Sequence, residues 1–509
     1  MKKCALRYFC PIVFVLLAGS PNLFAQAVGS ITGTVTDPSG AVVAGAKVTA
    51  TRVETGVAQS TVTTGAGTYT LPRLDVGTYN LACEATGFKT GTATGITLDV
   101  SQTRSVDFTL VVSGVTQSVE VTAAPPLLNT TDGTLAQVVS GEQTQNLPLN
   151  GRNIDGLMMM QPGVVASTGL MGWMGAGMVP NSTNNEMVGN GNRGETEVGT
   201  LDGADVSDAE MGTIQFTNFN LDAISEFKVQ ANNYSAQYGQ GAGVLTQIVS
   251  KTGTNQFHGS LFEFVRNSDL DSRNFFATTV PPFKRNEFGG TFGGPIVKDK
   301  TFFFVQYAGL RQRLGEPNFG NVPTAAERQG MVTITGANGQ ADNLAVPLNA
   351  TAQEVLGRYP LPNDPAGPYG PNTFNYEFSQ PTNDDQFSVR LDHHFSSKDT
   401  FFARASYANV VLKDVDPWAA ELGGSNFSSS NIGDARNYAL SETHLFSPTL
   451  LGNFMFTLNR GIEGVPETPA EYTTTNTSYG GIGGLSSWGP DTFETKYVTT
   501  VFEPKGSIQ

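Results

Sequence analysis

Histidines and carboxylates are the side chains from which a catalytic or metal-binding site would be built, and the sequence contains 4 His and 45 Asp and Glu. The histidines stand at positions 258, 393, 394 and 444, and none begins a His-x-x-Glu or His-Glu-x-x-His pattern. His393 and His394 are adjacent on an expected strand and so point to opposite faces, which disfavours a shared metal ion. Spacing alone pairs no carboxylates for acid–base chemistry. We therefore expect no catalytic residue, no metal site, no cofactor and no enzymatic activity.

The glycine-rich segment from Tyr238 to Val244 is a second candidate for chemistry, because glycines can bring the backbone close to a phosphate. No Gly-Lys-Ser/Thr follows, and the flanking segments do not form a strand-to-helix phosphate site. Gly239, Gly241 and Gly243 instead predict tight bends and close packing ahead of a short buried strand at 245–249.

The N-terminus has the pattern of a secretory signal, with three early cationic residues and an apolar stretch from Phe9 to Ala18. That stretch is shorter than the roughly 20 residues of a membrane-spanning helix, and no later segment is apolar enough to be one. We expect removal of residues 1–25, which takes away Lys2, Lys3 and Arg7 and changes the net charge from −15 to −18. Such an acidic exported chain is a poor candidate for nucleic-acid binding.

Residues 28–112 alternate short strand-like stretches with turns such as Asp37-Pro38-Ser39-Gly40, which predicts a β-sandwich. Cys83 is expected in its core and has no disulfide partner once the signal is removed. Four motifs occur in order: Gly33-Thr34-Val35-Thr36-Asp37, Gly45-Ala46-Lys47-Val48, Gly67-Thr68-Tyr69 and Leu74-Asp75-Val76-Gly77-Thr78-Tyr79. Their order resembles the carboxypeptidase regulatory-like domain, which implies a non-catalytic accessory module.

Residues 113–129 form a connector that contains the extended, β-branched stretch Val119-Glu120-Val121-Thr122. An exposed strand of this kind can add to the sheet edge of a partner. It could equally be the last strand of the sandwich or plain linker.

Residues 130–252 carry an ordered set of short motifs. They are Leu147-Pro148-Leu149-Asn150-Gly151-Arg152-Asn153, Asn192-Arg193-Gly194, Leu201-Asp202-Gly203, Ile224-Ser225-Glu226-Phe227-Lys228-Val229 and the glycine segment after Tyr238. This set resembles the plug domain of TonB-dependent receptors, particularly the Oar-like group with an N-terminal regulatory-like domain. The resemblance implies a small mixed α/β plug, and it makes Val119, Glu120, Val121 and Thr122 a candidate TonB box, the segment that the TonB energy-transducing complex grips.

Charged residues of the expected plug could pair with a surrounding barrel wall and act as a latch that is released by pulling. They are Arg152, Arg193, Glu226 and Lys228. Ordinary solvated charge is an equal alternative, because exposed ion pairs contribute little. The plug glycine motif comprises Tyr238, Gly239, Gly241 and Gly243.

Residues 257–509 contain the alternation of antiparallel membrane-barrel strands, in which apolar side chains face lipid and polar ones face the lumen. Phe387, Val389 and Leu391 alternate with polar residues, and similar stretches surround 401–407 and 453–459. We expect a loop-rich excursion over 313–383. Alternation yields roughly seven to nine strands, whereas related transporters close barrels of roughly 22, so we expect an incomplete barrel and an N-terminal fragment.

The expected fold is thus mainly β: an N-terminal β-sandwich, a small mixed α/β plug and an incomplete antiparallel transmembrane β-barrel. The family resemblance implies an outer-membrane receptor that imports an extracellular glycan, peptide or metal chelate by TonB-driven plug rearrangement. It also implies contact with outer-membrane lipid and a periplasmic N-terminal domain. The alternative is a surface adhesion or carbohydrate- or matrix-binding protein built on the sandwich, without transport.

Overall fold

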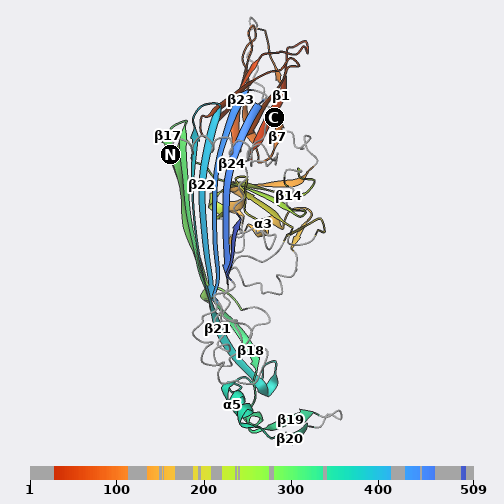
Figure 1. Ribbon diagram of the computed structural model, residues 1–509, viewed down its shortest axis with the longest axis vertical. Coiled ribbons are helices and arrows are strands. Elements are labelled where there is room, and N and C mark those ends of the chain that lie inside the picture. Colours follow the sequence, from red (N-terminus) through yellow and green to blue (C-terminus); the bar gives the residue numbers. More distant parts are fainter. Residues whose placement is uncertain are drawn as a thin grey trace, which may run out of the picture.

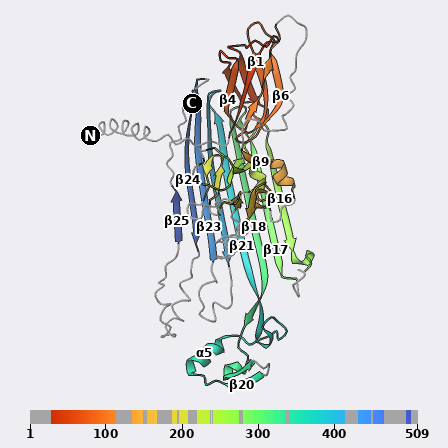
Figure 2. The ribbon, with the colours of Figure 1, turned by 90° about the vertical axis from the view of Figure 1, so that its right-hand side faces the viewer.

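The computed structural model describes three bodies, namely an N-terminal sandwich, a small mixed domain and a large curved sheet (Figures 1 and 2). It describes residues 28–112, 134–147, 152, 154–166, 187–192, 196–207, 220–235, 238, 241–273, 280–335, 341–413, 430–447, 450–464 and 494–499. The expected signal peptide and the candidate TonB box, Val119 to Thr122, lie outside these residues. In the described part of the chain, no helix has the length and apolar character needed to cross a membrane.

The N-terminal body packs two sheets face to face, which confirms the predicted β-sandwich. One sheet has the order β4-β1-β7 with β8 also paired to β1, and the other has the order β3-β2-β5-β6. The strands are β1 Gly29–Thr36, β2 Lys47–Arg52, β3 Ala58–Val62, β4 Thr68–Leu74, β5 Gly77–Glu84, β6 Gly91–Leu98, β7 Thr103–Ser105 and β8 Phe108–Thr109. Tyr69 is buried between the sheets and donates a hydrogen bond of 2.6 Å to the Val106 carbonyl oxygen. Cys83 is buried in the same core and is a free thiol, as expected.

The middle body is the predicted small α/β unit, with a mixed sheet of order β13-β12-β15-β14-β9. Its elements are β9 Leu135–Ser140, α2 Gly141–Asn146, α3 Asp155–Met158, β10 Val164–Ala166, β11 Met187–Gly189, β12 Val198–Leu201, β13 Ala204–Asp205, the 3-10 helix η2 Leu221–Ala223, β14 Ile224–Asn232 and β15 Leu245–Ser250. Ser140 and Gln143 form a reciprocal capping box that starts α2. Phe227 and Ile248 lie in a core that also includes Phe304 of the large sheet, so this body packs directly against that sheet.

The large sheet is wholly antiparallel and has the order β16-β17-β18-β21-β22-β23-β24-β25. Its strands are β16 His258–Asn267, β17 Phe283–Val297, β18 Thr301–Asn321, β21 Thr373–His394, β22 Asp399–Lys413, β23 Ser430–Ser447, β24 Leu450–Gly464 and β25 Glu494–Thr499, with a 3-10 helix η3 Ser268–Leu270 between the first two. The sheet curves around the middle body (Figure 1). The alternation is as predicted, since Phe387 and Leu391 are exposed on the outer face while Ser388 and Arg390 are buried on the inner one.

The excursion expected over 313–383 is shorter than predicted. The β18–β21 ladder continues to the pair Asn321↔Thr373, so the two strands run past their neighbours and carry a small head at one end of the molecule (Figure 2). The head contains η4 Glu327–Gln329, β19 Met331–Thr335, β20 Ala341–Ala345, α5 Ala350–Arg358 and η5 Gly370–Asn372. The prediction ended β18 too early and began β21 too late, because the polar residues in these extensions lack the alternation that marks a strand with one buried face.

Gly33 on β1 is a position where the sandwich has no room for a side chain. A Cβ there would lie 1.9 Å from the Val106 carbonyl oxygen, a backbone atom that cannot move without breaking the sheet packing. We predict that Gly33→Ala destabilises the sandwich by about 1–3 kcal/mol, the usual cost of overpacking. Gly65→Ala is the matched control, since nothing lies within 4 Å of its Cβ position. Hydrogen exchange of the β1 amides measures both effects, and equal protection in the two variants would contradict the packing argument.

Candidate functional site

Asp202 lies at the centre of the contact between the middle body and the curved sheet. It sits in the tight turn between β12 and β13, with a left-handed φ of 52°, and Gly203 follows with a φ of 81°. The turn points the carboxylate away from its own sheet and toward the inner face of the large curved sheet, which we call the wall. The side chain of Asp202 is 3% exposed, so its charge must be balanced by protein groups.

Two arginines from neighbouring strands of the wall supply that balance. Arg390 of β21 places its Nη1 2.9 Å from Oδ1 of Asp202, and Arg404 of β22 places its Nε 2.8 Å from Oδ2. Ser250, the last residue of β15, adds a backbone N–H bond of 2.9 Å and a hydroxyl bond of 2.7 Å to the same carboxylate. We call Asp202, Ser250, Arg390 and Arg404, together with Asp392, the ion cluster.

Each arginine makes further contacts, most of them with the wall and one, from Arg404, with β12 of the middle body. Arg390 donates to both oxygens of Asp392 at 2.8–3.1 Å, and its guanidinium lies 4.7 Å from the ring centroid of Phe402. Arg404 has a side chain that is 0% exposed and donates to Oδ1 of Asn437 at 2.6 Å and to the Leu201 carbonyl oxygen at 3.0 Å. Two carboxylates thus face two guanidinium groups, and the buried cluster carries no net charge.

The ion cluster also sets the protonation of Asp202. Burial alone would raise the pKa of this carboxyl, but Arg390, Arg404 and the donors of Ser250 hold the pKa below its ordinary value of 3.8. A lowered pKa means that the ionised form is favoured when the cluster is assembled. The cluster is therefore fully formed above pH 3.8 and weakens only as the pH falls through the lowered pKa.

Arg152 forms a second contact between the same two bodies. It makes an ion pair with Asp222 of the middle body, and its Nε lies 3.7 Å from Oε1 of Glu287 on β17. Its guanidinium also lies 4.7 Å from the ring centroid of Phe262 and 4.5 Å from that of Phe264, both on β16. Of the proposed latch residues, Arg152 is thus placed against the wall, and Arg193 lies outside the described residues.

Glu226 and Lys228 lie on β14, on the side of the plug sheet that meets the N-terminal sandwich. Glu226 accepts a hydrogen bond from the Val100 backbone N–H, and Lys228 Nζ donates to the Ser101 carbonyl oxygen at 3.2 Å. Val100 and Ser101 belong to the sandwich, so these contacts join the sandwich to the middle body. The latch hypothesis had expected Glu226 and Lys228 to contact the barrel wall.

The glycine motif packs where its backbone comes closest to β12. A Cβ at Gly241 would lie 2.5 Å from the Thr196 carbonyl oxygen, and one at Gly243 would lie 2.8 Å from the same oxygen. Tyr238 accepts a hydrogen bond of 2.6 Å from Gln247 of β15. Gly239 lies outside the described residues.

Sequence reasoning missed most of the ion cluster. The sequence contains Leu201-Asp202-Gly203 as a motif, but the motif does not show that the side chain of Asp202 points toward the wall. Alternation placed Arg390 on the inner face, and a search for cations on that face is the signal that could have found it. Arg404 lies in a stretch described only by its apolar residues.

Comparison with known proteins identifies the separate parts of the chain. Residues 249–507 match the outer membrane beta barrel domain family, and residues 30–111 match the carboxypeptidase regulatory-like domain family. The chain is 27% identical over 304 residues to the TonB-dependent transporter Oar of Myxococcus xanthus, which covers 58% of this chain and 27% of that protein.

Solved structures with a similar arrangement include the siderophore receptor PirA from Acinetobacter baumannii and the outer membrane transporter YddB from Escherichia coli. PirA is 17% identical with a TM-score of 0.41, covering 66% of this chain and 41% of its own. YddB is 11% identical with a TM-score of 0.41, covering 65% of this chain and 39% of its own. The chain spans less than half the length of each.

We predict that Asp202→Asn loosens the middle body from the wall, because it leaves two buried guanidinium groups facing a neutral side chain. Loss of one partner from a buried ion pair costs about 3–5 kcal/mol. Hydrogen exchange of the β15 amides, Leu245–Ser250, should therefore become faster in the variant.

Asp385→Asn is the matched control for this substitution. Asp385 pairs with Arg311 at 2.8 Å, but the two side chains are 40% and 36% exposed, so the pair contributes roughly 0–1 kcal/mol. Equal exchange rates in the two variants would show that the ion cluster does not anchor the middle body.

Proposed function

We propose that the chain takes part in energised uptake of an extracellular solute across the outer membrane, from the premise that it belongs to the outer membrane beta barrel domain family and is similar to the TonB-dependent transporter Oar. That relative is a transporter, and we propose no enzymatic activity for this chain. The middle body is the plug, and the curved sheet is the barrel wall. The solute class that we propose is a glycan, a peptide or a metal chelate.

The observation that carries this proposal is the ion cluster. A plug that must move during transport needs anchors that are specific when closed and that break together when it is pulled. Ion pairs and hydrogen bonds suit this role because they depend steeply on distance and direction. Ser250 bonds to Asp202 within the plug while Arg390 and Arg404 reach it from two wall strands, so a small displacement of the β12–β13 turn breaks both ion pairs.

The outer face of the wall supports contact with membrane lipid. Large apolar side chains are exposed there at alternate positions, as a lipid-facing surface requires. They include Phe387, Leu391, Tyr407, Tyr438, Leu440, Phe454 and Phe456. The head on the β18–β21 extension is then extracellular, and the opposite end, with its short turns and the sandwich, is periplasmic.

We further propose that Val119, Glu120, Val121 and Thr122 are the TonB box. The segment follows the sandwich, which ends at Val112 in the described residues, and precedes β9 of the plug. A force applied at this point of the chain reaches the plug sheet through β9. An extended, β-branched segment can pair with a sheet edge of TonB.

The adhesion alternative finds less support, since it needs a sandwich that is free to bind a surface. One end of the sandwich is occupied, because residues 99–101 contact β14 of the plug.

Cell fractionation distinguishes transport from adhesion by a secreted protein. The transport proposal predicts recovery in outer membranes with heat-modifiable migration in gels, and recovery as a soluble secreted protein would reject it.

We predict that deletion of Val119 to Thr122 weakens binding of the purified periplasmic domain of TonB at least about tenfold, because main-chain pairing supplies the affinity in strand addition. Deletion of residues 113–116 is the control, because it shortens the connector equally and leaves the segment intact. Titration calorimetry on the outer-membrane protein measures both variants. Equal binding by the two deletions would place the TonB contact elsewhere.

A further inference from the structure

The N-terminal sandwich sits against the short-turn end of the barrel wall and against the plug (Figure 2). One contact is apolar and small, with Val76 and Val100 of the sandwich packed on Val249 of β15. A second is made to the wall, where Asn255 donates its backbone N–H to the Glu54 carbonyl oxygen at 3.0 Å and its side-chain amide to that of Thr55 at 2.7 Å.

The approach to the wall is close at Gly56. A Cβ at this residue would lie 2.5 Å from Oδ1 of Asp299, which is in the turn between β17 and β18. Asp299 is itself held by Asn255 through a bond of 2.7 Å. The sandwich therefore has a defined contact with the end of the wall at the β17–β18 turn, which we call its seat.

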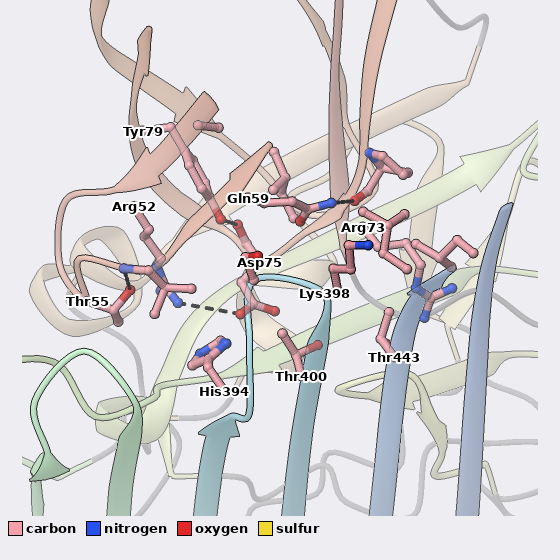
Figure 3. A pocket seen from close by; sticks show the side chains of 17 residues that line it. Arg52, Thr55, Gln59, Arg73, Asp75, Tyr79, His394, Lys398, Thr400 and Thr443 are labelled. Carbon is pink, nitrogen blue, oxygen red and sulfur yellow. Dashed lines mark hydrogen bonds and ion pairs between the residues drawn. The ribbon is translucent and has the colours of Figure 1, made fainter. Parts of the chain in front are cut away.

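The rest of the interface contains cavities that are lined by both polar and apolar groups. A cavity of about 320 Å³ lies between the three bodies and is lined by Arg52 and Asp75 of the sandwich and by Asp202, Ser250 and Arg390 of the ion cluster. Beside it lies a smaller pocket of about 60 Å³. Figure 3 shows Arg52 and Asp75 of the sandwich facing His394, Lys398 and Thr400 of the wall in this pocket. The sandwich thus covers a chamber that reaches the ion cluster, which we also call the plug anchor.

An interface with one small apolar contact, a few hydrogen bonds and a central cavity resembles a separable contact between domains more than a continuous core. Such an interface can open without unfolding either partner. Opening it would expose the chamber and, through it, the carboxylate of Asp202.

Glu226 is the group that makes the opening of this interface sensitive to pH. Its side chain is buried in the interface and accepts the Val100 N–H, and Asp99 on the sandwich is near enough to repel its charge. The cations that act on this pair of carboxyls are Lys228 on the plug and Arg104 on the sandwich. Two carboxyls that are brought together in a buried place favour a state with one proton between them.

We propose that the sandwich is a reversible cap over the plug anchor, and that its release is coupled to the loss of a proton from Glu226 to solvent. Only the purpose that we assign to the cap rests on the proposed transport function. That purpose is to shield the plug anchor until the plug moves. The docking itself and its dependence on protons are properties of the chain alone.

The direction of the coupling follows from the environment of Glu226. Burial, reinforced by Asp99, raises the pKa of Glu226 from 4.5 to about 8 in the docked state. Release returns the carboxyl to water, where its ordinary pKa applies, so docking takes up a proton. Docking is therefore tightest below pH 4.5, weakens as the pH rises, and reaches its minimum above about pH 8.

The test measures how far the sandwich lies from the plug in the full chain reconstituted in lipid nanodiscs. Spin labels at Ser39→Cys and Glu142→Cys report this distance, since both residues are exposed and the native Cys83 is buried. The population at the docked distance should fall between about pH 5 and about pH 9. In Glu226→Gln, whose amide mimics the protonated acid, the fall should be smaller, because Asp99, whose pKa burial also raises, is left to titrate at the interface. The docking constant near pH 8 should be at least about tenfold higher than in the unaltered chain.

Glu84→Gln is the charge-matched control, because Glu84 is exposed on the sandwich and should leave the pH profile unchanged. Asp99→Asn is a second variant that tests the same pair from the other side. It removes the carboxyl that raises the pKa of Glu226, so the midpoint of release should move to lower pH.

Two results would overturn the proposal. One is release of the sandwich by Glu226→Gln, which would show that an ionised Glu226 paired with Lys228 holds the interface. The other is a docked population that does not change with pH in the unaltered chain. Neither TonB nor a solute is present in this measurement, so its failure is distinguishable from a failure of the TonB-binding prediction.

Discussion

A carboxylate that has lost its water must be surrounded by hydrogen-bond donors and positive charge, and Asp202 satisfies this constraint with groups from two different bodies. Ser250 belongs to the plug, whereas Arg390 and Arg404 belong to the wall. Neither body alone can hold these charges in a buried place. The plug therefore occupies one position against the wall, and the orientation of its sheet follows from it.

The wall strands are arranged to make this contact. Period-two alternation sends Arg390 and Arg404 inward while their neighbours Leu391 and Ala403 face the opposite way. The β21–β22 register places Arg390 directly opposite Arg404, so two guanidinium groups meet at one carboxylate. Such a pair of like charges is tolerated because Asp202 and Asp392 lie between and beside them. The same strand geometry that presents an apolar face to lipid thus presents the plug anchor to the lumen.

The sandwich adds a second level of organisation. Its seat uses the backbone N–H and side-chain amide of Asn255, just before β16, and the side chains of Glu226 and Lys228 on β14. A cavity lies between the sandwich and the ion cluster. Glu226 and Lys228 thus lie between the sandwich and the plug, and Arg152 lies between the plug and the wall. The sandwich contacts both other bodies, and the connector between sandwich and plug lies outside the described residues.

The sequence by itself determined the fold class, because the features that encode it are local. Alternation along Gln386–His394, the turn-separated strands of the sandwich and the order of short motifs in the plug all act within a few residues, and each predicted the element that the structure contains. The packing role of Gly241 and Gly243 is local in the same sense.

Only the tertiary structure decided which charges meet. Asp202 and Arg404 are about 200 residues apart, Val100 and Glu226 are 126 apart, and no periodicity spans such separations. The latch hypothesis chose Glu226 and Lys228 by charge type, but the face of β14 that they occupy depends on where the sandwich docks. A buried ion pair requires surroundings that exclude water from it, and those surroundings exist only when the bodies that contribute to the pair have come together.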